Sequence, residues 1–364
     1  MPNFLSLRFL AIASIALFMC ACETRRTSDL SYQPVSQKEL PFFEHDTIID
    51  AVPALKRSCA TMLKQGNKKY PVPQNSSLSG KLKDWHSFCT AVTAEHSRQP
   101  THWKALLQKH LTPYKVSLDG NLEGQFTGYY EPLLHGSKRR HGRYKTPLYR
   151  YPSNKSVNVK FSRADIVRGA LKSKKLELVW VDDPVDAFFL QIQGSGRVML
   201  DNGKMLRIGY AGTNKHAYHP IGKTLLERGE LPRGGVTMQS IRKWLKAHPK
   251  QAEEIMSTNE SYVFFQELTN GDGPVGSQGV ELTPRRSIAV DPSYIGLGTP
   301  LWLDIEHPIH GKKRLQHLTI AQDTGGAIKG GLRADYFWGF GEEATHFAGK
   351  MNSKGHLYIF LPKS

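Results

Sequence analysis

The apolar residues of this 364-residue chain change their spacing near Tyr114, and this change constrains the fold more than any other feature. Before it, apolar residues recur at three- and four-residue steps, which predicts amphipathic helices. Short β-rich runs separated by Gly and Pro follow it, so we expect a mixed fold with strands dominating the last two thirds. The helix faces contain Ile49, Val52, Leu55, Cys59 and Met62; Leu82, Trp85, Cys89 and Val92; and Trp103, Leu106, Leu107 and His110.

The turn residues place several of the later elements. Asp201-Asn202-Gly203 between the β-rich runs 187–200 and 204–212 predicts a hairpin. A Gly- and Pro-containing linker occupies 270–274. Further strands are expected at 262–265, 287–290, 299–305, 316–321 and 357–361, and further helices at 221–228, 238–247 and 341–351.

Two carboxylates twelve residues apart, Asp323 and Asp335, stand in the glycine-rich and aromatic stretch 321–339. Burial among aromatic rings raises the pKa of a carboxyl, which a general acid needs near neutral pH. Asp323 lies in an Asp-Thr-Gly sequence like that of aspartic proteases, but those enzymes use two such loops and this chain has one. Asp335 could instead be a helix cap or an ion-pair partner of Arg333, and this alternative stays open from residue type alone.

Other motifs are less specific. Gln191-Ile192-Gln193-Gly194-Ser195-Gly196 lacks the features of a phosphate-binding loop and of a nucleophile elbow, and we expect a tight hairpin that lines a cleft. Asp291 precedes a proline at the end of a β-rich run, where aspartate usually forms turns. The fifteen histidines are dispersed and no His-Glu-x-x-His or Cys-x-x-Cys occurs, so metal binding is not expected.

The first residues read as an export signal. Arg8 precedes an apolar run, 9–19, that is too short for a stable transmembrane helix and fits the core of a signal peptide. Ala21 before Cys22 predicts a bacterial lipoprotein signal over 1–21 with lipidation of Cys22, and cleavage of an ordinary secretory signal near Ala21 is the alternative. Residues 22–45 are polar and predict a tether, and Glu23 favours the outer membrane.

The net charge of +17, from 49 basic and 32 acidic residues, favours an anionic partner, or serves solubility alone. No zinc finger or other nucleic-acid-binding module is recognisable. Cys59 and Cys89 lie on apolar helix faces, where an exported protein can form a disulfide or bury two free thiols.

An ordered set of motifs after about residue 45 resembles the membrane-bound lytic murein transglycosylase A family. The C-terminal part resembles the three-aspartate domain, whose aspartates match Asp291, Asp323 and Asp335. The motifs are 126–132 (FTGYYEP), 191–196 (QIQGSG), 210–212 (YAG), 261–265 (SYVFF), 286–291 (RSIAVD) and 323–330 with Asp335.

The resemblance implies a mainly β fold with α-helices. A double-psi β-barrel would be formed by 46–123 and 266–364, and a smaller β-domain, 124–265, would be inserted between them. A groove between the two would hold the glycan strand. No cofactor is implied, and we expect a monomer that is lipid-anchored in the outer membrane and faces the periplasm.

The implied reaction cleaves the β-1,4 bond between N-acetylmuramic acid and N-acetylglucosamine of peptidoglycan without water and leaves a 1,6-anhydro sugar. Asp335 matches the residue that serves as acid and then base, and Asp323 a supporting carboxylate. Asp291 would hold a loop at the substrate site. A non-catalytic peptidoglycan-binding lipoprotein is the alternative. The expected substrate contacts are Gln193, Gly194, Ser195, Tyr129, Tyr130 and Trp338.

Overall fold

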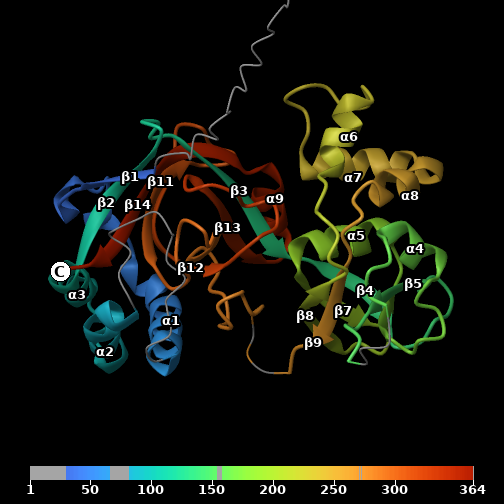
Figure 1. The fold of residues 1–364 in the computed structure, drawn as a ribbon, viewed down its shortest axis with the longest axis horizontal. Coiled ribbons are helices and arrows are strands. Elements are labelled where there is room, and N and C mark those ends of the chain that lie inside the picture. Colours follow the sequence, from blue (N-terminus) through green and yellow to red (C-terminus); the bar gives the residue numbers. More distant parts are fainter. Residues whose placement is uncertain (1–29, 66–81, 154–157, 270, 272, 364) are drawn as a thin grey trace, which may run out of the picture.

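The computed structural model describes residues 30–65, 82–153, 158–269, 271 and 273–363. Within them the strands form an eight-stranded and a six-stranded sheet, which lie side by side in Figure 1. The predicted signal peptide and Cys22 lie outside the described residues. The fold is a double-psi β-barrel with helices, joined to a smaller β-domain, as the resemblance implied.

The larger sheet closes on itself. Its order is β1-β2-β14-β11-β12-β10-β13-β3, and β14 also pairs with β3, so six of the strands form a closed barrel. Closure leaves these six strands no free edge, because each finds two partners. The strands are β1 (Leu30–Pro34), β2 (Leu111–Leu118), β3 (Gly124–Glu131), β10 (Ser287–Val290), β11 (Pro300–Glu306), β12 (Arg314–Asp323), β13 (Arg333–Phe340) and β14 (Asn352–Pro362).

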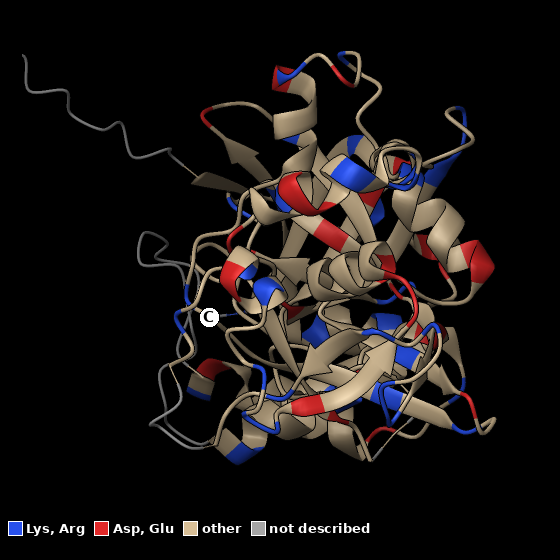
Figure 2. Ribbon diagram, turned by 90° about the vertical axis from the view of Figure 1, so that its right-hand side faces the viewer, with Lys and Arg blue, Asp and Glu red and all other residues tan. Residues whose placement is uncertain are grey.

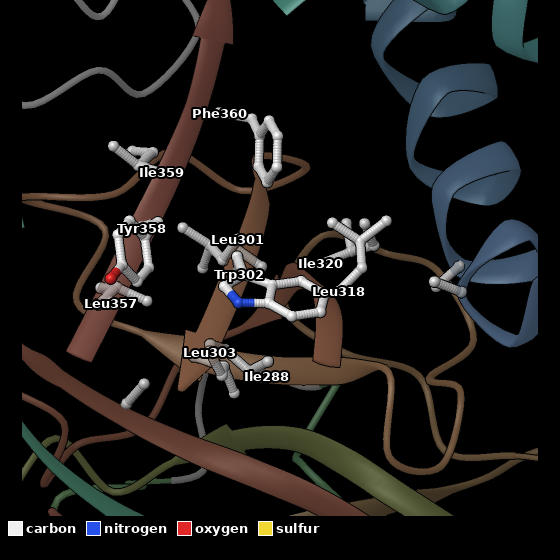
Figure 3. Close-up of a cluster of buried hydrophobic side chains, with 14 of the residues drawn as sticks. Ile288, Leu301, Trp302, Leu303, Leu318, Ile320, Leu357, Tyr358, Ile359 and Phe360 are labelled. Carbon is white, nitrogen blue, oxygen red and sulfur yellow. The ribbon is translucent and has the colours of Figure 1, made fainter. Parts of the chain in front are cut away.

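Large apolar side chains are buried on both faces of the barrel sheet (Figure 3). Trp302 on β11 is fully buried and meets Phe43 edge-to-face at 5.1 Å between ring centroids. Leu318 and Ile320 of β12 and Phe360 of β14 are also fully buried. Alternation along the strands places Trp302, Leu318 and Ile320 on the outer face of the barrel, under the N-terminal segment, and Leu301 and Leu303 on the inner face, and both sets are buried.

Three helices cover one end of the barrel, as the three- and four-residue spacing predicted. They are α1 (Val52–Gln65), α2 (His86–Ala94) and α3 (Pro100–His110). Cys59 on α1 and Cys89 on α2 are buried and form a disulfide, which decides between the two states that the sequence left open.

The N-terminal residues 30–45 extend the barrel sheet and pack on its core, and the prediction of a tether through residue 45 is wrong for them. β1 pairs with β2, and Phe43 is buried in the core. The segment's end is held by Arg286, whose Nη1 donates to both carboxylate oxygens of Asp46 at 2.9 and 3.0 Å, while Nη2 donates to the Thr47 carbonyl. Both charged side chains are nearly fully buried, so each needs the other as a partner.

The second sheet has the order β5-β6-β4-β7-β8-β9. As Figure 1 shows, α6, α7 and α8 lie together at one end of this unit. The start of β3, where the inserted domain was expected to begin, still belongs to the barrel sheet. The strands are β4 (Leu133–Ser137), β5 (Thr146–Tyr149), β6 (Glu177–Val181), β7 (Ser195–Leu200), β8 (Met205–Thr213) and β9 (Val263–Glu267), and the helices are α4 (Arg163–Arg168), α5 (Pro184–Gln193), α6 (Ile221–Glu227), α7 (Met238–Ala247) and α8 (Pro249–Ser257).

One secondary-structure prediction in this unit is wrong. The run expected to be a strand from residue 187 is helical up to Gln193, and only β7 is extended. Asp183 caps α5 by accepting from the N–H groups of Val185 and Asp186, and Pro184 occupies the first turn. A cap followed by proline is a helix start signal, but the β-rich apolar residues after it concealed that signal. The predicted hairpin is confirmed as β7 and β8.

Charged residues do not separate by sign on the surface. In the view of Figure 2, Lys and Arg alternate with Asp and Glu over the helices and loops. This side of the molecule therefore shows no separate basic face. In the described part of the chain, no helix combines the length and the apolar composition that crossing a membrane requires.

The disulfide should stabilise the helical end of the barrel. Replacing both cysteines with alanine in a form that begins at residue 30 is expected to lower the free energy of unfolding by about 2–4 kcal/mol, because the open chain gains conformational freedom. Urea denaturation measures the difference. Dithiothreitol should lower the stability of the parent form and leave the double variant unchanged. Two free thiols in the denatured, unreduced parent form would contradict the prediction.

Candidate active site

Strand β10 positions the two carboxylates that the sequence singled out. Ala289 of β10 pairs with Asp323 of the parallel strand β12 on one side and with Asp335 of the antiparallel strand β13 on the other. Directly paired residues on neighbouring strands project from the same face of a sheet. Asp323 and Asp335 therefore lie on one face, two strand spacings or roughly 10 Å apart at Cα, with the small Ala289 side chain between them.

A bulge at the end of β12 directs Asp323 to this face. Ile288 pairs with Ala321 and the next residue of β10 pairs with Asp323, so Gln322 is the extra residue. The Gln322 side chain points into the core, where its Nε2 donates to the Ala54 carbonyl and to Ser58 Oγ. Without the extra residue, strand alternation would exchange the directions of residues 322 and 323.

Asp323 accepts hydrogen bonds on both of its oxygens. Oδ1 accepts from the N–H and the hydroxyl of Ser277, at 2.9 and 2.8 Å, and from the Thr324 N–H at 2.9 Å. Oδ2 accepts from the Tyr129 hydroxyl at 3.2 Å. Burial raises the pKa of Asp323, and these four donors limit the rise because they stabilise the ionised form.

Asp335 has fewer hydrogen-bond donors. Its Oδ1 accepts from the Thr127 hydroxyl at 2.8 Å, and Thr127 in turn accepts from Arg333 Nη2 at 2.8 Å. Thr127 reaches Asp335 because the two residues are paired across β3 and β13. Burial raises the pKa of Asp335 to about 6, opposed by the Thr127 hydrogen bond and the Arg333 charge and supported by the negative charge of Asp323. Arg333 donates its hydrogen bond to Thr127 and forms no ion pair with Asp335 among the described residues, so the simple ion-pair alternative does not describe Asp335.

The same alternation explains why only some of the predicted aromatic residues are at the site. Tyr129 and Phe337 lie two residues beyond Thr127 and Asp335, face the same way, and pack with Ala289 in a small apolar cluster beneath the carboxylates. Burial, together with the charges of Asp323 and Asp335, raises the pKa of Tyr129 well above its ordinary value, so its hydroxyl keeps the proton that it donates.

Trp338 projects from the other face of β13, and the prediction that it contacts substrate is not supported. It is 5% exposed and stacks on Phe347 at 4.7 Å between ring centroids, and its Nε1 donates to Met351 Sδ. An aromatic side chain one strand position away from a site residue points to the opposite face, which residue type alone does not reveal.

A groove of about 600 Å³ runs between the barrel and the second unit, and Asp323 and Asp335 both line it. From the barrel side it is also lined by Tyr129, Ser277 and the glycine-rich turn 324–328. Ser277 reaches Asp323 because Gly276 passes close to the backbone of β12, where a Cβ would lie 2.4 Å from the Gln322 carbonyl oxygen. The opposite wall includes Arg163, Gln191, Gln193, Gly194, Ser195, Tyr210, Tyr218, Asn259 and Ser261.

The polar bend predicted to line a cleft does so, although as a helix end instead of a hairpin. Gly194 closes α5 in the left-handed conformation at φ +80°, which brings Gln193, Gly194 and Ser195 to the groove. Gln193 Oε1 accepts from the Tyr130 N–H at 3.0 Å and so joins the end of α5 to β3. The Tyr130 side chain is buried and does not line the groove.

Asp291 is buried and holds a loop. Its Oδ1 accepts from the Ser293 N–H at 3.0 Å and its Oδ2 from the Gly330 N–H at 2.9 Å. Gly330 follows the turn that lines the groove, so Asp291 positions the end of that turn and does not line the groove itself.

The structure adds residues that the sequence did not single out. Thr127 and Ser277 contact the two carboxylates, and Tyr218 and Arg163 face them across the groove. Thr127 reaches the site because it is paired with Asp335 across β3 and β13, and this register cannot be predicted from one sequence. Among the described residues, no group of three or more His, Cys, Asp or Glu could hold a metal ion.

The closed barrel, the second sheet and the groove lined by two buried carboxylates define a two-sheet protein with a candidate acid–base site. Two family models match the chain: the MltA specific insert domain over residues 125–266 and the 3D domain over residues 286–361. Membrane-bound lytic murein transglycosylase A of Escherichia coli K12 is 38% identical over 243 residues, which are 65% of each chain. The match therefore spans slightly less than two thirds of that relative.

Solved structures match over nearly the whole chain. The lytic transglycosylase LtgG of Burkholderia pseudomallei is 42% identical, with a TM-score of 0.60 and coverage of 93% of this chain and 98% of that one. Escherichia coli MltA with bound chitohexaose is 27% identical, with a TM-score of 0.72 and coverage of 92% and 95%. The chain belongs to the membrane-bound lytic murein transglycosylase A family.

The raised pKa of Asp335 predicts a pH-dependent stability difference. At pH values below its ordinary pKa of 3.8, the carboxyl is protonated in the folded and the unfolded chain. As the pH rises through about 6, the folded chain must carry a buried charge, so this contribution destabilises it. Asp335→Asn should therefore gain about 1–3 kcal/mol relative to the parent chain between pH 4 and 7.5, measured by urea denaturation.

Asp201→Asn is the matched control. Hydrogen bonds from His141 and Ser137 lower the pKa of this exposed carboxyl, so its charged form stabilises the folded chain. Above the ordinary pKa of 3.8 this charge is already formed in the folded and the unfolded chain, so the control should show no comparable gain between pH 4 and 7.5. A pH-independent difference for Asp335→Asn would contradict the raised pKa.

Proposed function

We propose that this protein is a peptidoglycan lytic transglycosylase. It cleaves the β-1,4 bond between N-acetylmuramic acid and N-acetylglucosamine and releases 1,6-anhydromuramyl products. Asp335 is the acid and then the base. The observation that carries the proposal is a groove-facing carboxyl with a pKa of about 6, which can hold a proton near neutral pH and also release it.

The groove suits a polysaccharide. It lies between the two units, and residues of both line it. The lining consists of polar side chains, backbone and three tyrosines, Tyr129, Tyr210 and Tyr218. Glycan rings pair polar edges with apolar faces, and such walls match both. The related Escherichia coli structure contains bound chitohexaose, a β-1,4-linked chain of N-acetylglucosamine. The Escherichia coli K12 relative is named a lytic murein transglycosylase.

The chemistry requires one carboxyl to transfer protons. Asp335 donates its proton to the glycosidic oxygen as the bond from that oxygen to C1 breaks. The C6 hydroxyl oxygen of the same muramyl residue then bonds to C1, and its proton passes to Asp335, which regenerates the acid. No water is consumed, in contrast to glycosidases, which use two carboxylates and a water molecule.

Asp323 has a supporting role in this proposal. The four hydrogen bonds that Asp323 accepts favour its ionised form, and a negative charge near C1 stabilises the oxocarbenium-like transition state. The charge also disfavours ionisation of Asp335 and so helps to keep the acid protonated. The two aspartates thus differ in role because their donors differ in number.

Substitution of Asp335 tests this mechanism. Asp335→Asn should reduce the rate of anhydro-product release from purified glycan strands by about 10²–10⁴-fold, because the amide cannot donate and recover a proton. Mass spectrometry of the products measures the rate. Digestion in ¹⁸O-labelled water should leave the products unlabelled.

Asp201→Asn, in the turn after β7, is the control and should keep full activity. Anhydro products formed at the parent rate by Asp335→Asn would remove Asp335 from this role. Products that carry ¹⁸O would indicate hydrolysis. Binding of strands by the parent chain with no product at all would indicate the non-catalytic binding protein.

We also propose that a lipid on Cys22 anchors the protein in the outer membrane, facing the periplasm. The relative's name places it at a membrane, and the apolar run 9–19 before Cys22 fits a lipoprotein signal. In bacteria fed labelled palmitate, the parent protein should carry the label and fractionate with outer membranes. Cys22→Ser should carry none, with Cys20→Ser as the labelled control. An unlabelled parent protein would contradict the anchor.

A further inference from the structure

Arg163, the first residue of α4, is a buried cation in the wall of the groove. Its side chain is almost completely shielded, since the residue is 3% exposed. Nε donates to the Asn259 carbonyl at 2.8 Å, and Nη2 donates to the Ser261 carbonyl. The guanidinium carbon lies 4.7 Å from the ring centre of Phe188 and 5.4 Å from that of Tyr262. These contacts fix the plane of the guanidinium group.

No carboxylate of the described residues forms an ion pair with Arg163, although a buried charge is costly without one. Burial lowers its pKa to about 10, so Arg163 is still cationic at neutral pH. The buried arginine of the barrel, Arg286, contrasts with it, because Asp46 neutralises that charge. The positive charge of Arg163 is therefore left to interact with whatever enters the groove.

The amide oxygen of a second side chain at the same wall has no hydrogen-bond donor among the described residues. Gln191 on α5 is 6% exposed, and its Oε1 accepts no hydrogen bond within the described part of the chain. Arg163 and Gln191 both line the groove, and both also line a second cavity of about 340 Å³ beside α4, α5 and α8. The walls of this cavity include Tyr149, Phe188, Met256 and Tyr262 and are largely apolar.

This wall lies close to the proposed acid. Tyr218 lines the groove between them, and after burial the two main influences on its pKa are the charges of Asp335, which raises it, and Arg163, which lowers it. Arg163, Tyr218 and Asp335 therefore line one groove, and a group attached to the sugar at the cleaved bond would lie in the same groove as Arg163.

We propose that Arg163 and Gln191 form a subsite for the carboxylate-bearing substituent of the muramyl residue. Arg163 binds the carboxylate, Gln191 Oε1 accepts an N–H or O–H of the same substituent, and its apolar part enters the second cavity. The proposal rests on the proposed function for its substrate. The carboxylate belongs either to the lactyl group of a bare strand or to the peptide attached to it.

Binding to the Asp335→Asn form tests the subsite without turnover. Three probes are compared by calorimetry: chitohexaose, which has no carboxylate; glycan strands stripped of peptide by an amidase; and strands that keep their peptides. Arg163→Gln in this background should weaken binding of carboxylate-bearing strands about 10- to 100-fold, because a charged hydrogen bond is lost, and should leave chitohexaose binding unchanged. Loss for stripped strands identifies the lactyl carboxylate, and loss only for peptide-bearing strands identifies the peptide.

Gln191→Glu is a second variant that keeps Arg163 in place. It adds a carboxylate at the same wall, neutralises the cation and should weaken strand binding in the same selective way. Arg168→Gln, at the exposed end of the same helix, is the matched control and should bind all probes like its parent. Retained chitohexaose binding reports that each variant is folded.

Equal effects of Arg163→Gln and Gln191→Glu on chitohexaose and on strands, or no effect of either on strands, would overturn the subsite. Failure of the proposed function is a separate result. The wild-type chain would then release no anhydro product, while selective loss of strand binding in the two variants would still support the subsite.

Discussion

Ala289 pairs with Asp323 on one side and with Asp335 on the other, and the candidate site depends on this arrangement of β10. A one-residue slip of either neighbour would turn its aspartate to the opposite face of the sheet. Barrel closure protects the register, because β10, β12 and β13 each have two partners and no free edge. The bulge at Gln322 completes the arrangement by directing one side chain into the core and the next to the groove.

The two carboxylates share one face but not one environment. Asp323 is surrounded by donors from Ser277, Thr324 and Tyr129, whereas Asp335 receives a single hydroxyl. Different numbers of donors separate the protonation behaviour of two similar groups. This difference makes an acid that works alone chemically reasonable, provided that the substrate supplies its own nucleophile.

The second unit supplies a positive charge and amide groups to the groove, opposite the carboxylates of the barrel. The barrel side of the groove carries negative groups, and the wall formed by α4, α5 and the segment before α6 carries a cation and amide groups. A substrate that carries a carboxylate near the cleaved bond would meet complementary charge on the wall opposite the acid. The side drawn in Figure 2 shows no separate basic face, so these local groups are more informative than the net charge of the chain.

The sequence alone determined the helical beginning, the hairpin at residue 203, the family resemblance and the two aspartates, because spacing, turn residues and ordered motifs are local properties of the chain. It could not separate Tyr129 from Trp338, or find Thr127, Ser277 and Arg163, since strand register and the approach of distant loops decide which side chains meet. It also mistook residues 187–193, most of α5, for a strand, where the Asp183 cap outweighed the β-rich composition. Only the tertiary structure decided that Cys59 bonds to Cys89 and that Asp335 is shielded enough to hold a proton near neutral pH, because burial and pairing depend on residues far apart in the chain.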